Sequence, residues 1–192
     1  MNTVDPIKDP AKILAIKMNL KRESNPRNYL LFSIGVNSAL RSSDLRNLKV
    51  SDVLDNKGNI KKYLYTRVKK TKREIKITIN KAMKEAINYY LSKAQVFIPD
   101  QYLFKSKRSH KPIDNVALFY LIKKWTKAVD LTNERYSAHS LRKTWGYQAR
   151  VYHNASIEMI SEKLGHRSTK VTKRYIGISQ EEVNKMEEEI NI

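Results

Sequence analysis

The sequence predicts a mostly α-helical fold with one small three-stranded antiparallel sheet. Three observations lead to this fold class. Apolar residues recur at helical spacing along most of the 192 residues, residues 53–79 change to the two-residue alternation of strands, and capping or turn residues separate the segments. The length fits one domain, and neither an internal repeat nor a low-complexity tract divides the chain.

The first helices are predicted from their starting residues. Asp9 followed by Pro10 is a favourable start, because Asp can cap free backbone amides and Pro fits the first turn. A second helix follows Pro26 and carries a long apolar run that ends near Arg41. The serine pair at 42–43 can then cap a short third helix.

Residues 53–79 are expected to form the sheet. Apolar and polar residues alternate across 63–68 and again across 75–79, which is the period of strands. Residues 56–59 read as a turn, and residues 69–73 read as a second, longer one. About three antiparallel strands follow from this spacing.

The remainder of the chain predicts further helices. Asn80 and Asp114 each precede an apolar stripe at helical spacing and are expected to be N-caps. Shorter helices are expected at 139–152, 156–164 and 168–175.

The last fourteen residues predict one more helix, of opposite charge to the rest. Ser179 and Glu182 have the spacing of a capping box, and an apolar stripe follows at Val183, Met186 and Ile190. Five Glu against one Lys give this segment a charge of −4, whereas residues 1–178 carry +23. The stripe is too narrow for a stable lone helix, so the segment is expected to dock, either on a neighbouring basic domain or on its own core.

The charge balance is the most informative part of the composition. The 38 Lys and Arg exceed the 19 Asp and Glu by 19, and a domain this basic usually faces a polyanion. Double-stranded DNA is the expected partner. A membrane surface fits less well, since no helix joins a long apolar face to a basic one and no run of 18 apolar residues exists. The absence of Cys excludes disulfides, thiolate nucleophiles and Cys-ligated zinc, and it fits a reducing compartment.

Two segments concentrate the positive charge. Residues 61–76 hold eight basic residues and one acid, and residues 105–111 hold four more basic residues. A hairpin with the tip Lys-Lys-Thr-Lys-Arg suits insertion into a groove or contact with phosphates. The predicted DNA-binding residues are Lys61, Lys62, Arg67, Lys69, Lys72, Arg73, Lys105, Lys107 and Arg108.

No cofactor is predicted. The sequence contains neither the glycine-rich phosphate loop nor the dinucleotide fingerprint, and its acids do not cluster as in a two-metal site. The four His lack a short metal-ligand spacing. The chemistry must then come from other residues.

A series of polar residues along the chain can supply this chemistry. His139 and Arg142 form a His-x-x-Arg motif, residues 164–166 read Leu-Gly-His, and Tyr175 follows nine residues after that His. Arg41 stands far upstream, directly after Ala39-Leu40. Each piece alone is weak, but their order and spacing together are specific.

This series resembles the tyrosine recombinase family, which includes phage integrases, Xer-type recombinases and the fimbrial-switch invertases. The family order is Arg, a hairpin Lys, His-x-x-Arg, Leu-Gly-His and a nucleophilic Tyr. The resemblance covers roughly residues 10–190; Ala39 stands where the family usually has Gly, and Asp44 stands where its first motif carries an acid. By this resemblance the catalytic residues are Arg41, Lys70, His139, Arg142, His166 and Tyr175. Lys72 is the alternative to Lys70, because hairpin register is uncertain.

The chemistry of these residue types agrees with phosphoryl transfer. Two Arg can donate to the non-bridging oxygens of a phosphodiester as charge develops on them. A Tyr hydroxyl, with a pKa of about 10, needs a base such as His139 before it attacks. A hairpin Lys can give a proton to the leaving 5′-oxygen. The resulting 3′-phosphotyrosyl bond conserves the energy of the phosphodiester, so neither ATP nor a metal is required.

The resemblance also implies an organisation. Most members carry a helical core-binding domain before the catalytic domain, whereas only forty residues precede Arg41. We therefore expect a catalytic domain at 1–178, a docking helix at 179–192 and no N-terminal core-binding domain. The expected function is site-specific recombination by a homotetramer on DNA, in the cytoplasm at the nucleoid, with accessory DNA-binding proteins as possible partners. The alternatives are relaxation of DNA by a type IB topoisomerase and a non-catalytic DNA-binding relic.

Overall fold

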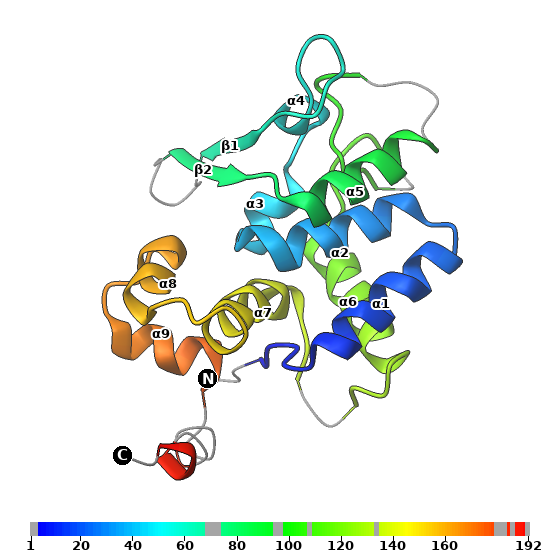
Figure 1. Ribbon diagram of the computed structural model, residues 1–192. Helices are drawn as coiled ribbons and strands as arrows, with labels where there is room; N and C mark the ends of the chain where they lie inside the picture. Colours follow the sequence, from blue (N-terminus) through cyan, green and yellow to red (C-terminus); the bar gives the residue numbers. More distant parts are fainter. Residues whose placement is uncertain are drawn as a thin grey trace.

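The computed structural model describes residues 4–67, 74–93, 98–106, 109–132, 135–178, 184 and 187–190. Within these residues the chain is mostly helical with one antiparallel hairpin (Figure 1). The elements, in chain order, are α1 (Pro10–Arg22), α2 (Pro26–Ser38), α3 (Ser42–Arg46), α4 (Val50–Val53), β1 (Tyr63–Arg67), β2 (Glu74–Thr78), α5 (Lys81–Leu91), α6 (Asn115–Lys127), α7 (Ala138–Val151), α8 (Ile157–Leu164) and α9 (Thr169–Ile176).

The N-caps expected from the sequence are confirmed. The side chain of Asp9 accepts from the amide of Ala11, and α1 begins at Pro10. Asn80 and Asp114 cap α5 and α6 in the same way. The expected short helices at the C-terminal side correspond to α7, α8 and α9.

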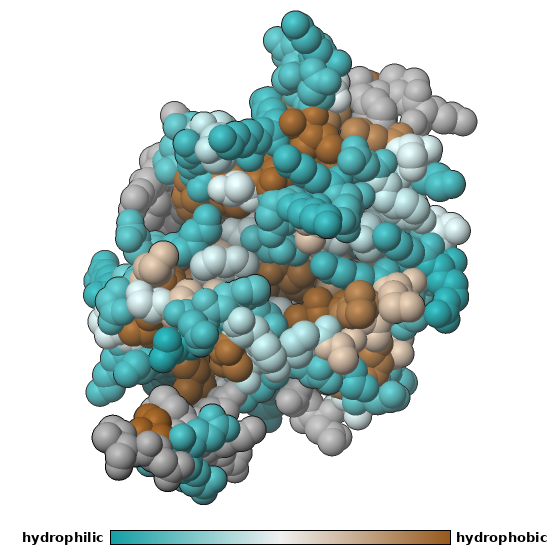
Figure 2. Space-filling view, viewed as in Figure 1, coloured by the Kyte–Doolittle hydropathy of each residue, from teal (hydrophilic) through white to brown (hydrophobic). Residues whose placement is uncertain are grey.

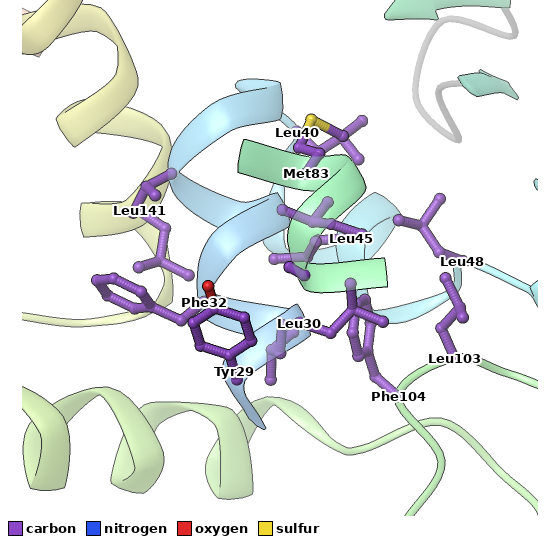
Figure 3. Close-up of a cluster of buried hydrophobic side chains, with 14 of the residues drawn as sticks. Tyr29, Leu30, Phe32, Leu40, Leu45, Leu48, Met83, Leu103, Phe104 and Leu141 are labelled. Atoms are coloured by element: carbon purple, nitrogen blue, oxygen red, sulfur yellow. The ribbon is translucent and has the colours of Figure 1, made fainter. Parts of the chain in front are cut away.

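Helix α2 forms the centre of the main core, which Figure 3 shows with α5 and α7 packed against it. Nearly every residue of α2 from Asn28 to Val36 is buried, as expected of a helix that is apolar on all sides. The ring of Phe32 meets that of Trp125 edge to face, with centroids 5.7 Å apart, which ties α2 to α6. The core therefore encloses the helix that leads into the first motif.

A glycine sets the spacing between α2 and α7. A Cβ at Gly35 would lie 2.5 Å from Cδ1 of Leu141, so only glycine permits this approach. Leu141 immediately precedes Arg142 in α7, and Arg41 follows α2 by three residues. This close contact brings the two arginines of the predicted site into the same region.

In the part of the chain that the structure describes, the sheet has two strands, so the prediction of three is wrong. Strands β1 and β2 pair with Leu64 opposite Ile77, and both side chains are buried, which agrees with the alternation in the sequence. The expected first strand is reduced to a single bridge between Leu54 and Ile60. The side chain of Asp55 accepts from the backbone amides of Lys57 and Asn59, both at 2.8 Å, and closes a tight turn that leaves no length for a ladder.

A smaller apolar cluster joins α7, α8 and α9. Its buried members are Ala39, Ile160, Leu164 and Ile176. A Cβ at Gly146 in α7 would lie 2.6 Å from Cγ2 of Ile176, so glycine again allows two helices to approach closely. This contact holds α9, which carries Tyr175, against α7, which carries Arg142.

The segment before α1 runs along α7 (Figure 1). The amide of Ile7 donates to Oγ1 of Thr144 at 2.8 Å, and Nε2 of Gln148 donates to the carbonyls of Ile7 and Lys8. The amide of Asp5 donates to the carbonyl of Arg135 just before α7. Ile7 and Lys8 are thus bonded to the helix that carries two predicted catalytic residues, and Asp5 is bonded to the segment just before it.

The predicted C-terminal helix falls mostly outside the described residues. Ser179, Glu182, Val183 and Met186 are not described, and of the apolar stripe only Ile190 is, as an exposed residue. Among the helices that the structure describes, none has the length and apolar character needed to cross a membrane.

Candidate active site

An open cleft of about 570 Å³ lies between β2, α8 and the side chains of Arg41 and Arg142. Its lining residues are Arg41, Glu74, Ile75, Lys76, Arg142, Met159, Glu162, Lys163, Leu164 and Gly165. Hydrophilic side chains dominate the face of the molecule seen in Figure 2, with hydrophobic ones in patches between them. The cleft combines four cations with two acids, so it suits an anion that brings more than one negative charge.

Arg142 is the most buried cation of the cleft, with 5% of its surface exposed. Its two Nη atoms donate to the backbone carbonyls of Ala39 and Leu164. Both carbonyls lie at helix C-termini, where C=O groups lack partners within the helix and carry partial negative charge. These bonds offset the cost of burying a guanidinium and join the end of α2 to the end of α8.

Left-handed backbone turns shape both helix ends. Ala39 has φ 58° and ψ 17°, and Gly165 has φ 62° and ψ 42°. Glycine adopts this region freely, whereas alanine does so at a cost. The turn at Ala39 leads directly to Arg41, and the turn at Gly165 leads directly to His166.

Arg41 enters the cleft from the residue just before α3. Its carbonyl accepts from the amide of Leu45 at 2.8 Å, so the backbone of Arg41 is fixed by the helix that follows. The side chain is half-buried and lines the cleft with Arg142. Asp44 is buried near Arg142 and contributes negative charge to it.

Tyr175 lies near the end of α9, half-buried, and close enough to Arg142 for the guanidinium to act on its phenol electrostatically. Burial raises the pKa of the Tyr175 phenol above its ordinary value, while Arg142 and then Arg41 oppose that rise. The His166 ring meets the Tyr175 ring edge to face, with centroids 4.7 Å apart. The two arginines are therefore placed to favour the phenolate within a partly dehydrated site.

His166 is held by the first turn of α9. Its Nδ1 lies 3.0 Å from Oγ1 of the buried Thr172, and this hydroxyl donates to the carbonyl of Ser168. The single hydroxyl proton of Thr172 is donated to Ser168, so the Thr172 oxygen acts as the acceptor toward His166. The proton of the His166–Thr172 bond is therefore on Nδ1. Burial, Arg142 and Arg41 lower the pKa of His166. A bound phosphate would oppose the effect of these cations on the pKa of His166 and would favour protonation of Nε2.

His139 lies in the first turn of α7, where its amide donates to the N-cap Ser137 at 3.3 Å. His139 as a whole is exposed, although part of its ring is buried. This partial burial lowers the pKa of His139, and the charges of Arg142, Lys143 and Arg41 lower it further. A His with a pKa below 6.5 is neutral at pH 7 and can accept a proton.

The structure thus brings together the cluster that the sequence predicted, apart from the hairpin lysine. The electrostatic effects of Arg41 and Arg142 reach His139, His166 and Tyr175. Lys70 and its alternative Lys72 lie outside the described residues, on the segment that joins β1 to β2.

The structure describes only some of the predicted DNA-binding residues. Lys69, Lys72, Arg73, Lys107 and Arg108 lie outside the described residues, as does the side chain of Arg67. Nζ of Lys61 donates to the carbonyl of Ser51 at 2.6 Å, so that side chain is bonded to α4. Lys62 is exposed and Lys105 is half-buried.

Three lysines at or beside the cleft are absent from the site residues predicted from the sequence. Lys76 and Lys163 line the cleft, and burial followed by Arg142 lowers the pKa of Lys163. Lys143 is almost fully buried beside Tyr175. The available signal was adjacency, since Lys143 follows Arg142 and Lys163 immediately precedes Leu-Gly-His. Within the described residues no group of three or more His, Cys, Asp or Glu could hold a metal ion.

The fold and this constellation are those of a tyrosine recombinase. The chain belongs to the phage integrase family, whose model matches residues 9–182. It is 36% identical over 181 residues to the probable integrase/recombinase YoeC of Bacillus subtilis (strain 168), covering 94% of this chain and 93% of that protein. It is 32% identical over 165 residues to the tyrosine recombinase XerC of Caldanaerobacter subterraneus subsp. tengcongensis, covering 83% of this chain and 44% of that protein.

Solved structures agree with this assignment of the fold. XerA recombinase superposes with a TM-score of 0.74 at 20% identity, covering 98% of this chain and 64% of that one. The XerH recombinase in a post-cleavage complex with a palindromic difH substrate gives a TM-score of 0.72 at 18% identity, covering 97% and 53%. The chain therefore spans nearly all of the Bacillus relative and less than two thirds of XerC, XerA and XerH.

Proposed function

We propose that this chain cleaves and rejoins DNA at specific sites through a 3′-phosphotyrosyl intermediate, with Tyr175 as nucleophile. The observation that carries the proposal is that the phenol of Tyr175 lies within the electrostatic influence of Arg142 and Arg41, which line one cleft, with its ring against that of His166. A buried arginine beside a phenol can bind a phosphate within reach of the phenol oxygen. Family membership over residues 9–182 supports the same chemistry.

Phosphate binding is assigned to the two arginines. Arg142 uses donors on the carbonyls of Ala39 and Leu164, and a guanidinium has five N–H donors in all. The remaining donors and the half-buried Arg41 serve the non-bridging oxygens. These bonds strengthen as negative charge develops in the pentacoordinate transition state, so they lower its energy more than that of the bound DNA.

Two proton transfers accompany the reaction, one from the attacking oxygen and one to the leaving oxygen. The phenol oxygen of Tyr175 forms a bond to phosphorus, and its proton passes to neutral His139. The bond from phosphorus to the 5′-oxygen breaks, and that oxygen takes a proton from a hairpin lysine, for which Lys70 is proposed and Lys72 is the alternative. His166 donates to a non-bridging oxygen. Rejoining reverses these steps from a free 5′-hydroxyl.

Binding to DNA is proposed to involve the basic residues of the hairpin and of the segment 105–111. The solved structures of related fold include XerH bound to difH DNA and a lambda integrase dimer bound to a core site. These support a multi-subunit complex on DNA, and we propose a homotetramer held by residues 179–192, with residues 1–178 as the catalytic domain. Accessory DNA-binding proteins and association with the nucleoid fit this role.

The proposal is tested by covalent trapping. DNA sites are first selected from a random library by binding to the protein, and nicked suicide substrates are then built from the recovered sequence. Wild-type protein should leave a covalent adduct on a denaturing gel, and Tyr175→Phe should abolish it with DNA affinity preserved, since one oxygen is lost and little volume changes.

Tyr152→Phe is the matched control, because Tyr152 is 52% exposed and lies at the end of α7. An adduct that persists in Tyr175→Phe would contradict the assignment of the nucleophile. Paired sites on one plasmid distinguish the type of reaction: exchange of the flanking segments supports recombination, whereas relaxation alone supports the topoisomerase alternative.

A further inference from the structure

Lys143 is a buried cation beside the nucleophile that the chemistry above does not use. It follows Arg142 in α7, has 4% of its surface exposed, and places Nζ 5.1 Å from the centroid of the Tyr175 ring. Lysines are almost never fully buried without compensation, because an ammonium loses hydration there. The Tyr175 ring face is one compensating partner.

The surroundings of Lys143 supply a second. Burial lowers the pKa of Lys143, and Asp5, from the segment before α1, raises it. Asp5 is held in place by Arg135, whose amide donates to its carboxylate at 3.1 Å and whose carbonyl accepts from its amide at 2.8 Å. The acid therefore favours the charged form of Lys143.

We propose that Lys143 is a positioning residue for Tyr175: its ammonium holds the phenol ring in orientation and stabilises the phenolate that forms during attack. This inference rests on the proposed function. A cation over an aromatic face is attracted to the electron density of the ring, and that density increases when the phenol loses its proton. The attraction is therefore stronger in the transition state than before it, which is the condition for accelerating the reaction.

Other charges around Tyr175 act at different places. Arg142 of α7 and Arg41, from the turn before α3, act on the phenol through their charge, and the His166 ring packs against the Tyr175 ring in a T-shaped pair. His139 and Arg142 face the same region from the first turns of α7, and Asp5 faces Lys143. Among these groups Lys143 lies over the ring face, so its removal leaves Arg142, Arg41 and His166 in place.

The experiment measures single-turnover adduct formation with Lys143→Met and Lys143→Arg. Met matches the length of Lys without charge, and Arg keeps the cation. Lys21→Met is the matched control, because Nζ of Lys21 lies 5.0 Å from the Tyr29 ring centroid, away from the cleft. The first-order rate constant is independent of the active fraction, so partial misfolding lowers only the amplitude.

Lys143→Met should slow adduct formation about 3- to 30-fold, the range that a partly desolvated cation–π contact supports. Lys143→Arg should recover most of the rate, and Lys21→Met should match the wild type. A substrate with a 5′-bridging phosphorothiolate should not rescue Lys143→Met, because sulfur leaves without a proton and the defect concerns the nucleophile.

A pH series separates this role from packing. Because Lys143 also lowers the pKa of His139, the series uses a His139→Gln background. Lys143 acts on the phenol only while it is charged, and burial lowers its pKa, so the ratio of the rate with Lys143 to the rate of Lys143→Met should fall toward one as the pH rises through that pKa. A packing role of the side chain would leave this ratio constant.

Three results would overturn the inference: an unchanged rate constant in Lys143→Met, full rescue by the phosphorothiolate, or a rate ratio that does not change with pH. Each of them leaves the reaction and its nucleophile intact, although full rescue would assign the general acid to Lys143 in place of the hairpin lysine. Failure of the wild-type protein to form an adduct through Tyr175 would instead contradict the proposed function itself. The two failures are therefore distinguishable in the same assay.

Discussion

The two apolar clusters among the described residues differ in size and in the catalytic residues that they support. The main core surrounds α2, draws on α1, α5, α6 and α7, and contains large buried rings such as Phe32 (Figure 3). The second cluster rests on Ile160, Leu164, Ile176 and the small Ala39. The main core supports the approach to Arg41 and the start of α7, whereas the second supports α9 and its nucleophile.

This difference indicates that the two clusters support different parts of the catalytic machinery. Phosphate-binding arginines must keep a fixed geometry, because electrostatic stabilisation depends on groups that are already oriented. A nucleophile that becomes covalently bonded to DNA and is later released can tolerate a less extensively packed support. Arg142 connects the two parts, since it bonds to the carbonyl of Ala39 at the end of α2 and to that of Leu164 at the end of α8.

The largest effect is expected when this connection is removed. Arg142→Ala should lower the cleavage rate about 10²- to 10³-fold, by analogy with the loss of one oxyanion donor. It should also leave two buried carbonyls unpaired, at a cost of about 1 to 3 kcal/mol each in the free energy of unfolding. Arg41→Ala should reduce the rate comparably with little loss of stability, because Arg41 is half-buried and Arg142 is almost fully buried.

The measurements are single-turnover cleavage at saturating DNA and urea unfolding of the free protein. Arg142→Lys is an informative control, since it keeps a charge but cannot bond both carbonyls as a planar fork does. Equal stability losses in Arg41→Ala and Arg142→Ala would contradict the view that only Arg142 connects the two clusters.

The second expected effect compares the two clusters directly. Phe32→Ala should lower the global free energy of unfolding by about 3 to 5 kcal/mol, because it leaves a cavity in the main core. Ile176→Ala removes a fully buried side chain of the smaller cluster and should cost about 2 to 5 kcal/mol, expressed first as local opening of α9.

Hydrogen exchange read by mass spectrometry distinguishes the two outcomes. Ile176→Ala should speed exchange in α8 and α9 while amides of α2 keep their protection, and the rate of adduct formation should fall with it. Phe32→Ala should speed exchange throughout. Uniform loss of protection in Ile176→Ala would show that the two clusters unfold together.

Much of this arrangement follows from sequence patterns, because the signals are local. Asp9, Asn80 and Asp114 cap their helices through residues two or three positions away, so each can be recognised without knowledge of the fold. The catalytic series was found from motif order and spacing. The apolar alternation in the hairpin also predicted the buried pair Leu64 and Ile77.

The parts that the sequence did not predict depend on distant contacts or on competing local ones. The third strand was lost because Asp55 bonds to the backbone of its own turn, an alternative that the alternation of residues does not reveal. The partners of Arg142 lie 103 and 22 residues away, so its burial required the packed structure. Lys143 and Lys163 gained their positions in the same way.

The smallest expected effect concerns Ala39, where the chain leaves the main core. Its φ of 58° places an alanine in the left-handed region, which disfavours a Cβ by about 1 to 2 kcal/mol. Ala39→Gly removes this strain, while the greater freedom of glycine in the unfolded chain cancels part of the gain. We expect a net stabilisation of about 0.5 kcal/mol, which raises Tm by about 1 to 2 °C for a chain of this length.

The matched control is Ala86→Gly in the interior of α5, where the same change should destabilise the protein by about 1 kcal/mol. Differential scanning fluorimetry on the two variants and the wild type gives the comparison. The cleavage rate of Ala39→Gly should stay near that of the wild type, since the carbonyl that binds Arg142 is retained. A lower Tm in Ala39→Gly would mean that the small contacts of the Ala39 methyl group in the second cluster outweigh the backbone strain, and that this cluster is tighter than its few members imply.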